Sequence, residues 1–103
     1  METKHFLYKL IPPRPSFAMD MSEAEAAAMA EHAQYWRGLL AAGSAVAFGP
    51  VVEPSGVWGL AVVEAEDEAA VRAFGERDPA VTSGTATFEV YPMLSAVVRP
   101  HVA

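Results

Sequence analysis

Residues 57–64 read VWGLAVVE, and this stretch decides which fold the chain can adopt. It is rich in β-branched and aromatic residues, which is typical of a strand. Successive side chains of a strand point to opposite faces of the sheet. One face carries Trp58, Leu60 and Val62, and the other carries Val57, Ala61 and Val63. Because both faces are apolar, the stretch predicts a strand that needs cover on both sides.

The segment just before this strand predicts its hairpin partner. Ala45–Phe48 (AVAF) is a short apolar run, and Gly49-Pro50 should end it. Residues 51–56 (VVEPSG) contain the Pro and Gly that are typical of a turn. Two strands joined by so short a connection pair antiparallel, so 45–48 and 57–64 should form a hairpin.

A helix should precede the hairpin. Ser22 opens the sequence S-E-A-E, a capping box in which Glu25 is the third helical residue. The alanine-rich run that follows strongly favours helix, and Gly43 is a natural stop. These signals predict a helix over roughly 23–42.

A second helix should follow the hairpin. Asp67 can cap it, and Ala70, Val71 and Phe74 would lie on its buried face. A residue that precedes proline avoids the helical conformation, so Asp78, before Pro79, should lie just past the helix.

The outermost segments predict two more strands. Residues 4–10 (KHFLYKL) and 86–91 (ATFEVY) both alternate in polarity. Residues 11–17 (IPPRPSF) hold three prolines, which forbid helix or central strand and indicate a stiff loop. The resulting order, β-α-β-β-α-β, predicts a ferredoxin-like α+β fold with an antiparallel sheet.

Two helices can cover only one face of that sheet. The other face, built around Trp58, Leu60 and Val62, would be a large exposed apolar patch, which soluble monomers rarely carry. We therefore expect a homodimer packed through the sheet face, with a pocket near that face or between helix and sheet.

Composition narrows the classes of function. The chain of 103 residues fits one domain over 1–103, with a core of about 4–92 and an apolar tail at 93–103. Seven basic and 13 acidic residues give a net charge of −6, which argues against nucleic acid or anionic membrane as a partner. There is no cysteine, and the N-terminus lacks the apolar core of a signal peptide. A cytoplasmic protein is expected.

His32 and Asp78 are the candidate catalytic residues. A histidine oriented by a carboxylate is suited to proton transfer near neutral pH. Each residue also has a structural interpretation: the His32 ring would pack on Trp36 and bond a backbone carbonyl, and Asp78 would cap a turn. The residues alone leave both interpretations open.

Five further residues are candidates for contact with a small-molecule ligand. Arg14 could bind an anionic group, and the aromatic residues could line a ring-sized pocket or simply fill the core. They are Arg14, Phe17, Tyr35, Trp36 and Trp58. The histidines His5, His32 and His101 have no metal-ligand spacing, and no nucleotide-binding motif is present, so neither a metal nor a cofactor is expected.

With its elements placed, the chain resembles the YciI-related (YCII) family over most of its length. The resemblance is carried by HAQY at 32–35, Leu39-Leu40 before AAG, FGP at 48–50, Gly56, DP at 78–79 and Gly84. It implies a dimeric α+β barrel with an active site built on a His and an Asp, here His32 and Asp78. It also implies lyase-like chemistry on small ring compounds. The IPPRPSF loop and the apolar tail depart from the family pattern.

Three functions follow as hypotheses. The first is a cofactor-independent lyase or isomerase that acts on a small cyclic or carbonyl-bearing molecule, with His32 as the general base and Asp78 as the residue that orients it. The second is a non-catalytic module that binds a small ligand in the same pocket. The third is a purely structural dimer module. An ionisable pair in an apolar setting favours the first, because a mere binder needs no such pair.

Overall fold

The computed structural model of the chain describes residues 3–100, which contain one four-stranded antiparallel sheet. Its strands are β1 (Lys4–Ile11), β2 (Ala45–Glu53), β3 (Gly56–Ala65) and β4 (Thr87–Pro92), and they lie in the order β2-β3-β1-β4. Two long helices connect them, α2 (Glu23–Ala41) and α3 (Glu68–Arg77). The predicted β-α-β-β-α-β order and ferredoxin-like α+β fold are confirmed.

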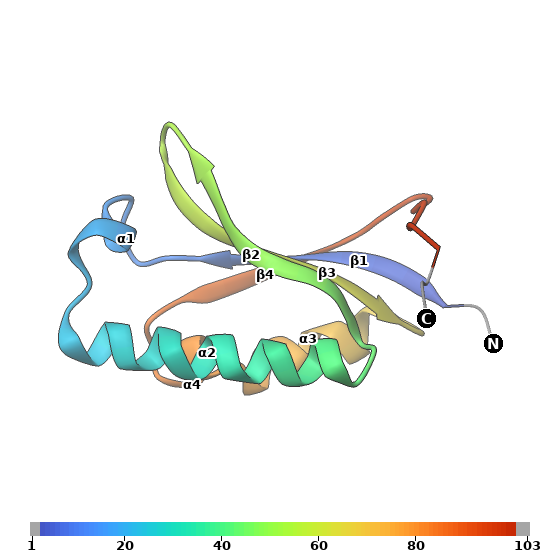
Figure 1. Cartoon of the computed structure of the whole chain (residues 1–103), viewed down its shortest axis with the longest axis horizontal. Helices are drawn as coiled ribbons and strands as arrows, with labels where there is room; N and C mark the ends of the chain where they lie inside the picture. The colour runs from blue at the N-terminus through green and yellow to red at the C-terminus, as the bar shows by residue number, and fades with distance from the viewer. Residues whose placement is uncertain (1–2, 101–103) are drawn as a thin grey trace.

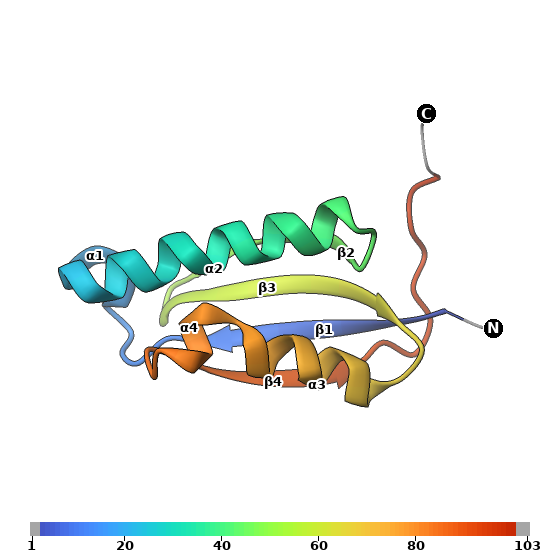
Figure 2. The ribbon, with the colours of Figure 1, turned by 90° about the horizontal axis from the view of Figure 1, so that it is seen from below.

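Both long helices lie on the same face of the sheet, and the opposite face carries none (Figures 1 and 2). Two single-turn helices complete the structure. Helix α1 (Phe17–Asp20) lies at one end of the sheet, between β1 and the start of α2, and α4 (Pro79–Thr82) directly follows α3.

The predicted capping box starts α2. The Ser22 hydroxyl accepts from the Glu25 backbone N–H at 3.1 Å, and the Glu25 carboxylate accepts from the Ser22 backbone N–H at 2.8 Å. Gly43 follows the helix with a φ of 87°, which glycine adopts without the strain that a Cβ would cause. Local sequence therefore fixes both ends of α2.

The predicted boundaries of the hairpin are wrong. Strand β2 does not end at Gly49-Pro50 but continues to Glu53, so residues 51–56 are not all turn and only Pro54 and Ser55 separate the strands. Pro50 pairs with Gly59 inside the strand. A proline is tolerated there because β2 is an edge strand, where a missing N–H costs no bond to a second neighbour.

The predicted loop over 11–17 is shorter than expected. Ile11 belongs to β1 and Phe17 begins α1, so the irregular part is residues 12–16. The proline restriction still holds, since Pro12, Pro13 and Pro15 all fall inside that irregular part.

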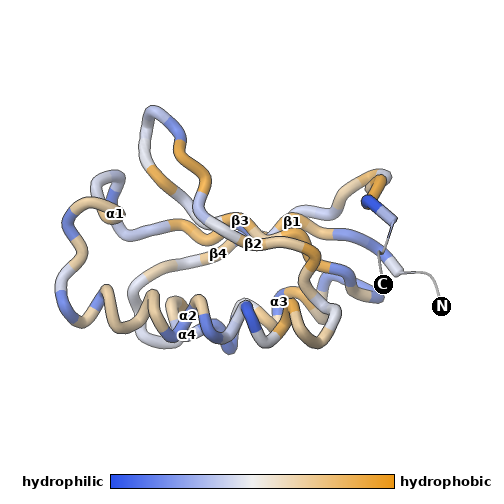
Figure 3. The backbone as a smooth tube through the Cα atoms, viewed as in Figure 1, coloured by the Kyte–Doolittle hydropathy of each residue, from blue (hydrophilic) through white to orange (hydrophobic). Residues whose placement is uncertain are grey.

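The sheet has two apolar faces, as the sequence of β3 predicted. Under the helices, β1 and β3 bury Phe6, Tyr8, Leu10, Ala61 and Val63. On the opposite face, Leu7 lies beside Val62 and Tyr91, and Leu60 lies beside Lys9. Figure 3 shows hydrophobic residues along the strands in the middle of the sheet, whereas the helices mix hydrophobic and hydrophilic residues.

Residues 93–100 of the predicted tail form neither helix nor strand. Leu94 and Val97 are fully exposed. Residues 101–103, with His101, lie outside the described residues. Within the described part of the chain, no helix is both long and apolar enough to cross a bilayer.

Candidate active site

His32 and Asp78, which are 46 positions apart in the sequence, meet beneath the sheet. The Nδ1 atom of His32 lies 2.8 Å from Oδ1 and 2.9 Å from Oδ2 of Asp78. The rings of His32 and Trp36 are tilted, with centroids 6.5 Å apart. The ring therefore bonds a carboxylate and not the backbone carbonyl of the structural interpretation.

The Asp78 carboxylate is completely buried and is surrounded by hydrogen-bond donors. Besides His32, the Tyr8 hydroxyl donates to Oδ2 at 2.9 Å, the Trp36 indole N–H donates to Oδ2 at 2.8 Å, and the Ala80 backbone N–H donates to Oδ1 at 2.9 Å. A buried carboxylate is costly unless its oxygens are paired in this way.

These donors keep Asp78 ionised. Burial by itself would raise the pKa of Asp78, but the hydrogen bonds from His32 and Trp36, the nearby His32 charge and the Ala80 amide outweigh it. The pKa of Asp78 is therefore lowered from its usual 3.8. Burial and the Asp78 charge raise the pKa of Tyr8, so Tyr8 remains a protonated donor.

An ionised Asp78 fixes the tautomer of His32. A carboxylate has no proton to donate, so Nδ1 of the neutral imidazole carries the hydrogen and Nε2 carries the lone pair. Within residues 3–100, no hydrogen bond engages Nε2 of His32. The ring is thus arranged to accept a proton at Nε2.

Local structure explains how the pair forms. His32 lies in the middle of α2, one turn before the buried Trp36. Pro79 holds Asp78 at an extended ψ of 124°, outside α3, and the Asp78 side chain caps α4. The Asp78 side chain therefore does both things that the sequence suggested: it caps a helical turn and it bonds His32.

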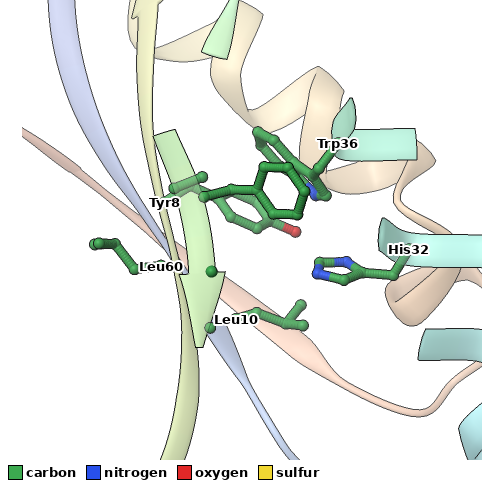
Figure 4. Close-up of a pocket in the computed structure, with 9 residues that line it drawn as sticks. Tyr8, Leu10, His32, Trp36 and Leu60 are labelled. Atoms are coloured by element: carbon green, nitrogen blue, oxygen red, sulfur yellow. The ribbon is translucent and has the colours of Figure 1, made fainter. Parts of the chain in front are cut away.

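Two cavities adjoin His32. The small one, of about 20 Å³, has room for about one water molecule. Figure 4 shows the His32 ring extending from α2 toward the strands, between Tyr8 and Leu10, while Leu60 points away to the other face.

The second cavity, named here the ring cavity, has a volume of about 230 Å³. Apart from His32, its lining consists only of apolar or aromatic side chains, proline and glycine. Both cavities share Leu10, His32, Phe48, Gly49 and Gly59 as lining residues. A cavity of about 150 Å³ is enough to hold benzene, so the ring cavity can take a substituted single ring.

Three of the predicted contact residues border these cavities. Phe17, which is buried, lines the ring cavity from α1, and Trp36 lines the small cavity. Trp58 borders the ring cavity, but its ring also interacts elsewhere: its indole N–H donates to Glu53 at 2.5 Å, and Lys9 lies over it at 4.9 Å.

The structure places the other two contact residues away from both cavities. The Arg14 guanidinium bonds Asp20 and Glu25 instead of facing the cavity. The Tyr35 hydroxyl donates to the Phe74 backbone carbonyl at 2.6 Å and so ties α2 to α3. Neither side chain is free to hold a ligand beside His32.

Tyr8 is the site residue that the sequence analysis missed. Tyr8 shares one face of β1 with Phe6 and Leu10, and all three side chains are buried under the helices. A buried tyrosine hydroxyl usually needs a hydrogen-bond partner, and that requirement was the available signal. Within residues 3–100, no group of three or more His, Cys, Asp or Glu side chains is arranged to hold a metal ion.

Comparisons with solved structures show the same fold. One similar structure is 5-chloro-2-hydroxyhydroquinone dehydrochlorinase (TftG) from Burkholderia phenoliruptrix AC1100, in complex with 2,5-dihydroxybenzoquinone. Its TM-score is 0.62 at 21% identity, over 84% of this chain and 89% of the other. Another is the NE2512 protein of unknown function from Nitrosomonas europaea, with a TM-score of 0.52 at 17% identity, over 96% of this chain and 97% of the other.

A search of curated proteins found no match. The family model of the YCII-related domain, in contrast, matches residues 6–94, which include most of β1, all of the other three strands and both long helices. This protein therefore belongs to the YCII-related domain family.

Proposed function

We propose that this protein is a cofactor-independent enzyme of lyase or isomerase type that acts on a small cyclic molecule bearing a hydroxyl or carbonyl group. The observation that carries the proposal is the geometry of His32. Its Nδ1 is fixed by Asp78 at 2.8 and 2.9 Å, and its ring lines both cavities. His32 is the general base, and Asp78 is the residue that positions it.

The reaction begins with proton transfer to Nε2 of His32 from a hydroxyl or an acidic carbon of the substrate. The electron pair left behind either forms a new double bond and expels a leaving group with its own pair, or is reprotonated at another atom. The first course is an elimination and the second an isomerisation. Asp78 stabilises the imidazolium because an ionised carboxylate lies against its Nδ1–H.

The similar structure of a dehydrochlorinase supports the choice of reaction class. That enzyme is named for the removal of HCl from a chlorinated hydroxyhydroquinone, and its structure contains a dihydroxybenzoquinone. An elimination on a hydroxylated ring matches both a base and a ring-sized cavity. Chlorinated phenols therefore belong in the first substrate screen, with lactones and other halogenated rings.

A non-catalytic ligand-binding module is the second candidate, and the apolar lining of the ring cavity favours it. Such a module would bind a ring compound and release it unchanged. The two candidates differ in what the His32–Asp78 pair contributes: the enzyme needs its proton transfer, whereas a binder would lose little without it.

We also propose that the active form is a homodimer joined through the uncovered sheet face. The apolar strip of Leu7, Leu60 and Val62 on that face supports this, together with the exposed Tyr91 at its edge. A second copy of the same face would bury this strip, and a two-fold axis makes the surface self-complementary.

The catalytic proposal is tested with His32→Ala and Asp78→Asn. Each should lower turnover of a substrate from the screen by roughly 10²-fold or more, the usual scale for lost general acid–base catalysis. His5→Ala is the matched control, since it removes another His–carboxylate pair, His5 with Glu64 at 3.1 Å, away from both cavities. Full turnover in both site variants would refute catalysis by this pair. A native protein that binds the ring compounds of the screen without turning over any of them, and whose site variants bind them equally well, would favour the binding module.

A further inference from the structure

We propose that residues 12–21, named here the cover, close the ring cavity as a fixed wall held by Arg14, and that this wall limits the cavity to uncharged single-ring ligands. The inference concerns the same cavity as the proposed function and rests on its use for a ring compound. Arg14 is a positioning residue in this proposal and not a ligand contact.

The cover forms one side of the ring cavity. Pro12, Phe17, Ala18 and Met21 all line it. The rest of the lining includes His32 and Met29 from α2 and Phe48 from β2. Removal of the cover would take away part of the wall and open the cavity to water.

Arg14 joins the cover to α2. Its Nη1 and Nη2 atoms donate to the two carboxylate oxygens of Glu25, each at 2.8 Å. Its Nε donates to the Asp20 carboxylate at 2.8 Å, and Nη2 also donates to the Asp20 backbone carbonyl at 2.9 Å. Bidentate pairing of this kind fixes orientation as well as distance.

Two further contacts fix the same segment. The Ser16 hydroxyl donates to the Asp20 carboxylate at 2.7 Å, which closes the turn of α1. Pro15 lies directly on Gly56, the first residue after the hairpin turn, where a built Cβ would be 3.2 Å from the Pro15 Cα and carbonyl oxygen. The cover is therefore held both to α2 and to the start of β3.

The charges of the network explain the selectivity. Hydrogen bonds from Arg14 and then from the Ser22 backbone N–H lower the pKa of Glu25 to about 2, so Glu25 is ionised and balances the guanidinium. Asp20 is a second carboxylate on the same cation. Arg14 is thus balanced by its own carboxylates, and His32, the one lining side chain that can become a cation, lies against the ionised Asp78. No unbalanced positive charge therefore offsets the desolvation of an anionic ligand, and burial of an unpaired charge is strongly unfavourable.

The cover is tested with Arg14→Gln and Glu25→Gln. The second variant keeps an oxygen to accept from the Ser22 N–H, so it separates the Arg14 contact from the start of α2. Arg72→Gln is the matched control, because it removes an exposed Arg–Glu pair on α3 at 2.9 Å. Circular dichroism checks that each variant is folded.

The first readout is hydrogen exchange at Phe17 and Met19, whose N–H groups donate to the Arg14 and Ser16 carbonyls. The second is binding of toluene and of 4-methylbenzoate, a neutral ring and its carboxylate counterpart. The unmodified protein should bind toluene and exclude the anion. In Arg14→Gln and in Glu25→Gln, hydrogen exchange at these two amides should be about tenfold faster. The preference for toluene over 4-methylbenzoate should fall by about tenfold, the scale of ~1.4 kcal/mol.

Unchanged exchange and unchanged selectivity in both variants would overturn the proposal, as would tight binding of 4-methylbenzoate to the unmodified protein. Neither readout depends on turnover, so failure here leaves the catalytic test of His32 and Asp78 unaffected. Conversely, if the His32 and Asp78 variants kept full turnover, the cover and its selectivity for neutral rings could still be present.

Discussion

One carboxylate, Asp78, accepts hydrogen bonds from three elements of the structure. It accepts from His32 and Trp36 on α2, from Tyr8 on β1 and from the start of α4. The same side chain therefore orients His32, the proposed general base, and also ties the helices to the sheet. This double role means that Asp78→Asn should reduce stability as well as turnover, since an amide cannot accept from all of these donors.

Asp78 should also make stability depend on pH. Its pKa is lowered in the folded state, so its contribution is present above the usual value of 3.8 and is lost as pH falls through the folded pKa. The difference in free energy of unfolding between the native protein and Asp78→Asn should narrow as the pH falls below about 4. Urea unfolding at a series of pH values measures this difference. A difference that widens with acid would show that the carboxyl is protonated in the folded protein.

At the scale of elements, α3 approaches β4 unusually closely at Gly75. A Cβ built there would lie 2.6 Å from the ring of Phe88, and that ring stacks on Tyr8 with centroids 5.4 Å apart. The missing side chain allows α3 to reach the depth at which Asp78, just after the helix, meets Tyr8.

We predict that Gly75→Ala destabilises the protein by about 1–3 kcal/mol, the usual cost of overpacking a core. Gly38→Ala on α2 is the control, because no atom lies within 4 Å of its built Cβ. There, alanine should stabilise the helix by about 0.8–1.0 kcal/mol. Thermal or urea unfolding measures both variants. Equal effects of the two substitutions would mean that the contact with Phe88 relaxes without cost.

The end of strand β2 was harder to predict from the sequence than the starts of helices α2 and α3. The boundaries of α2 and α3 follow from caps that lie within three residues of the helix start, Ser22 with Glu25 and Asp67 with Ala70. The end of β2 depends instead on which strand is its neighbour. Pro50 ends a strand in the sheet interior but not at an edge, and the local sequence does not reveal strand order.

At the scale of the whole molecule, the apolar sheet face that the helices leave uncovered is the reason to predict a homodimer. Light scattering or sedimentation at micromolar concentration should give a mass near twice 11.0 kDa. Leu60→Glu, on the uncovered face, should produce monomers, because it places a charge in the apolar strip. Leu40→Glu, a control on the exposed side of α2, should leave the dimer intact. A monomeric native protein would contradict the dimer and leave the apolar strip unexplained.

The sequence by itself determined the order of elements, the two apolar faces of β3, the start and end of α2, and the placement of Asp78 outside α3. All of these depend on periodicity, caps and proline, which act over a few residues. Resemblance to the family then singled out His32 and Asp78.

Only the tertiary structure decided that Tyr8 and Trp36 share Asp78 with His32, that Arg14 bonds Glu25 and Asp20, and that Tyr35 faces α3. Each of these depends on which side chains from distant segments meet. That is set by strand order and by the depth of helix packing, and neither is encoded in local sequence spacing.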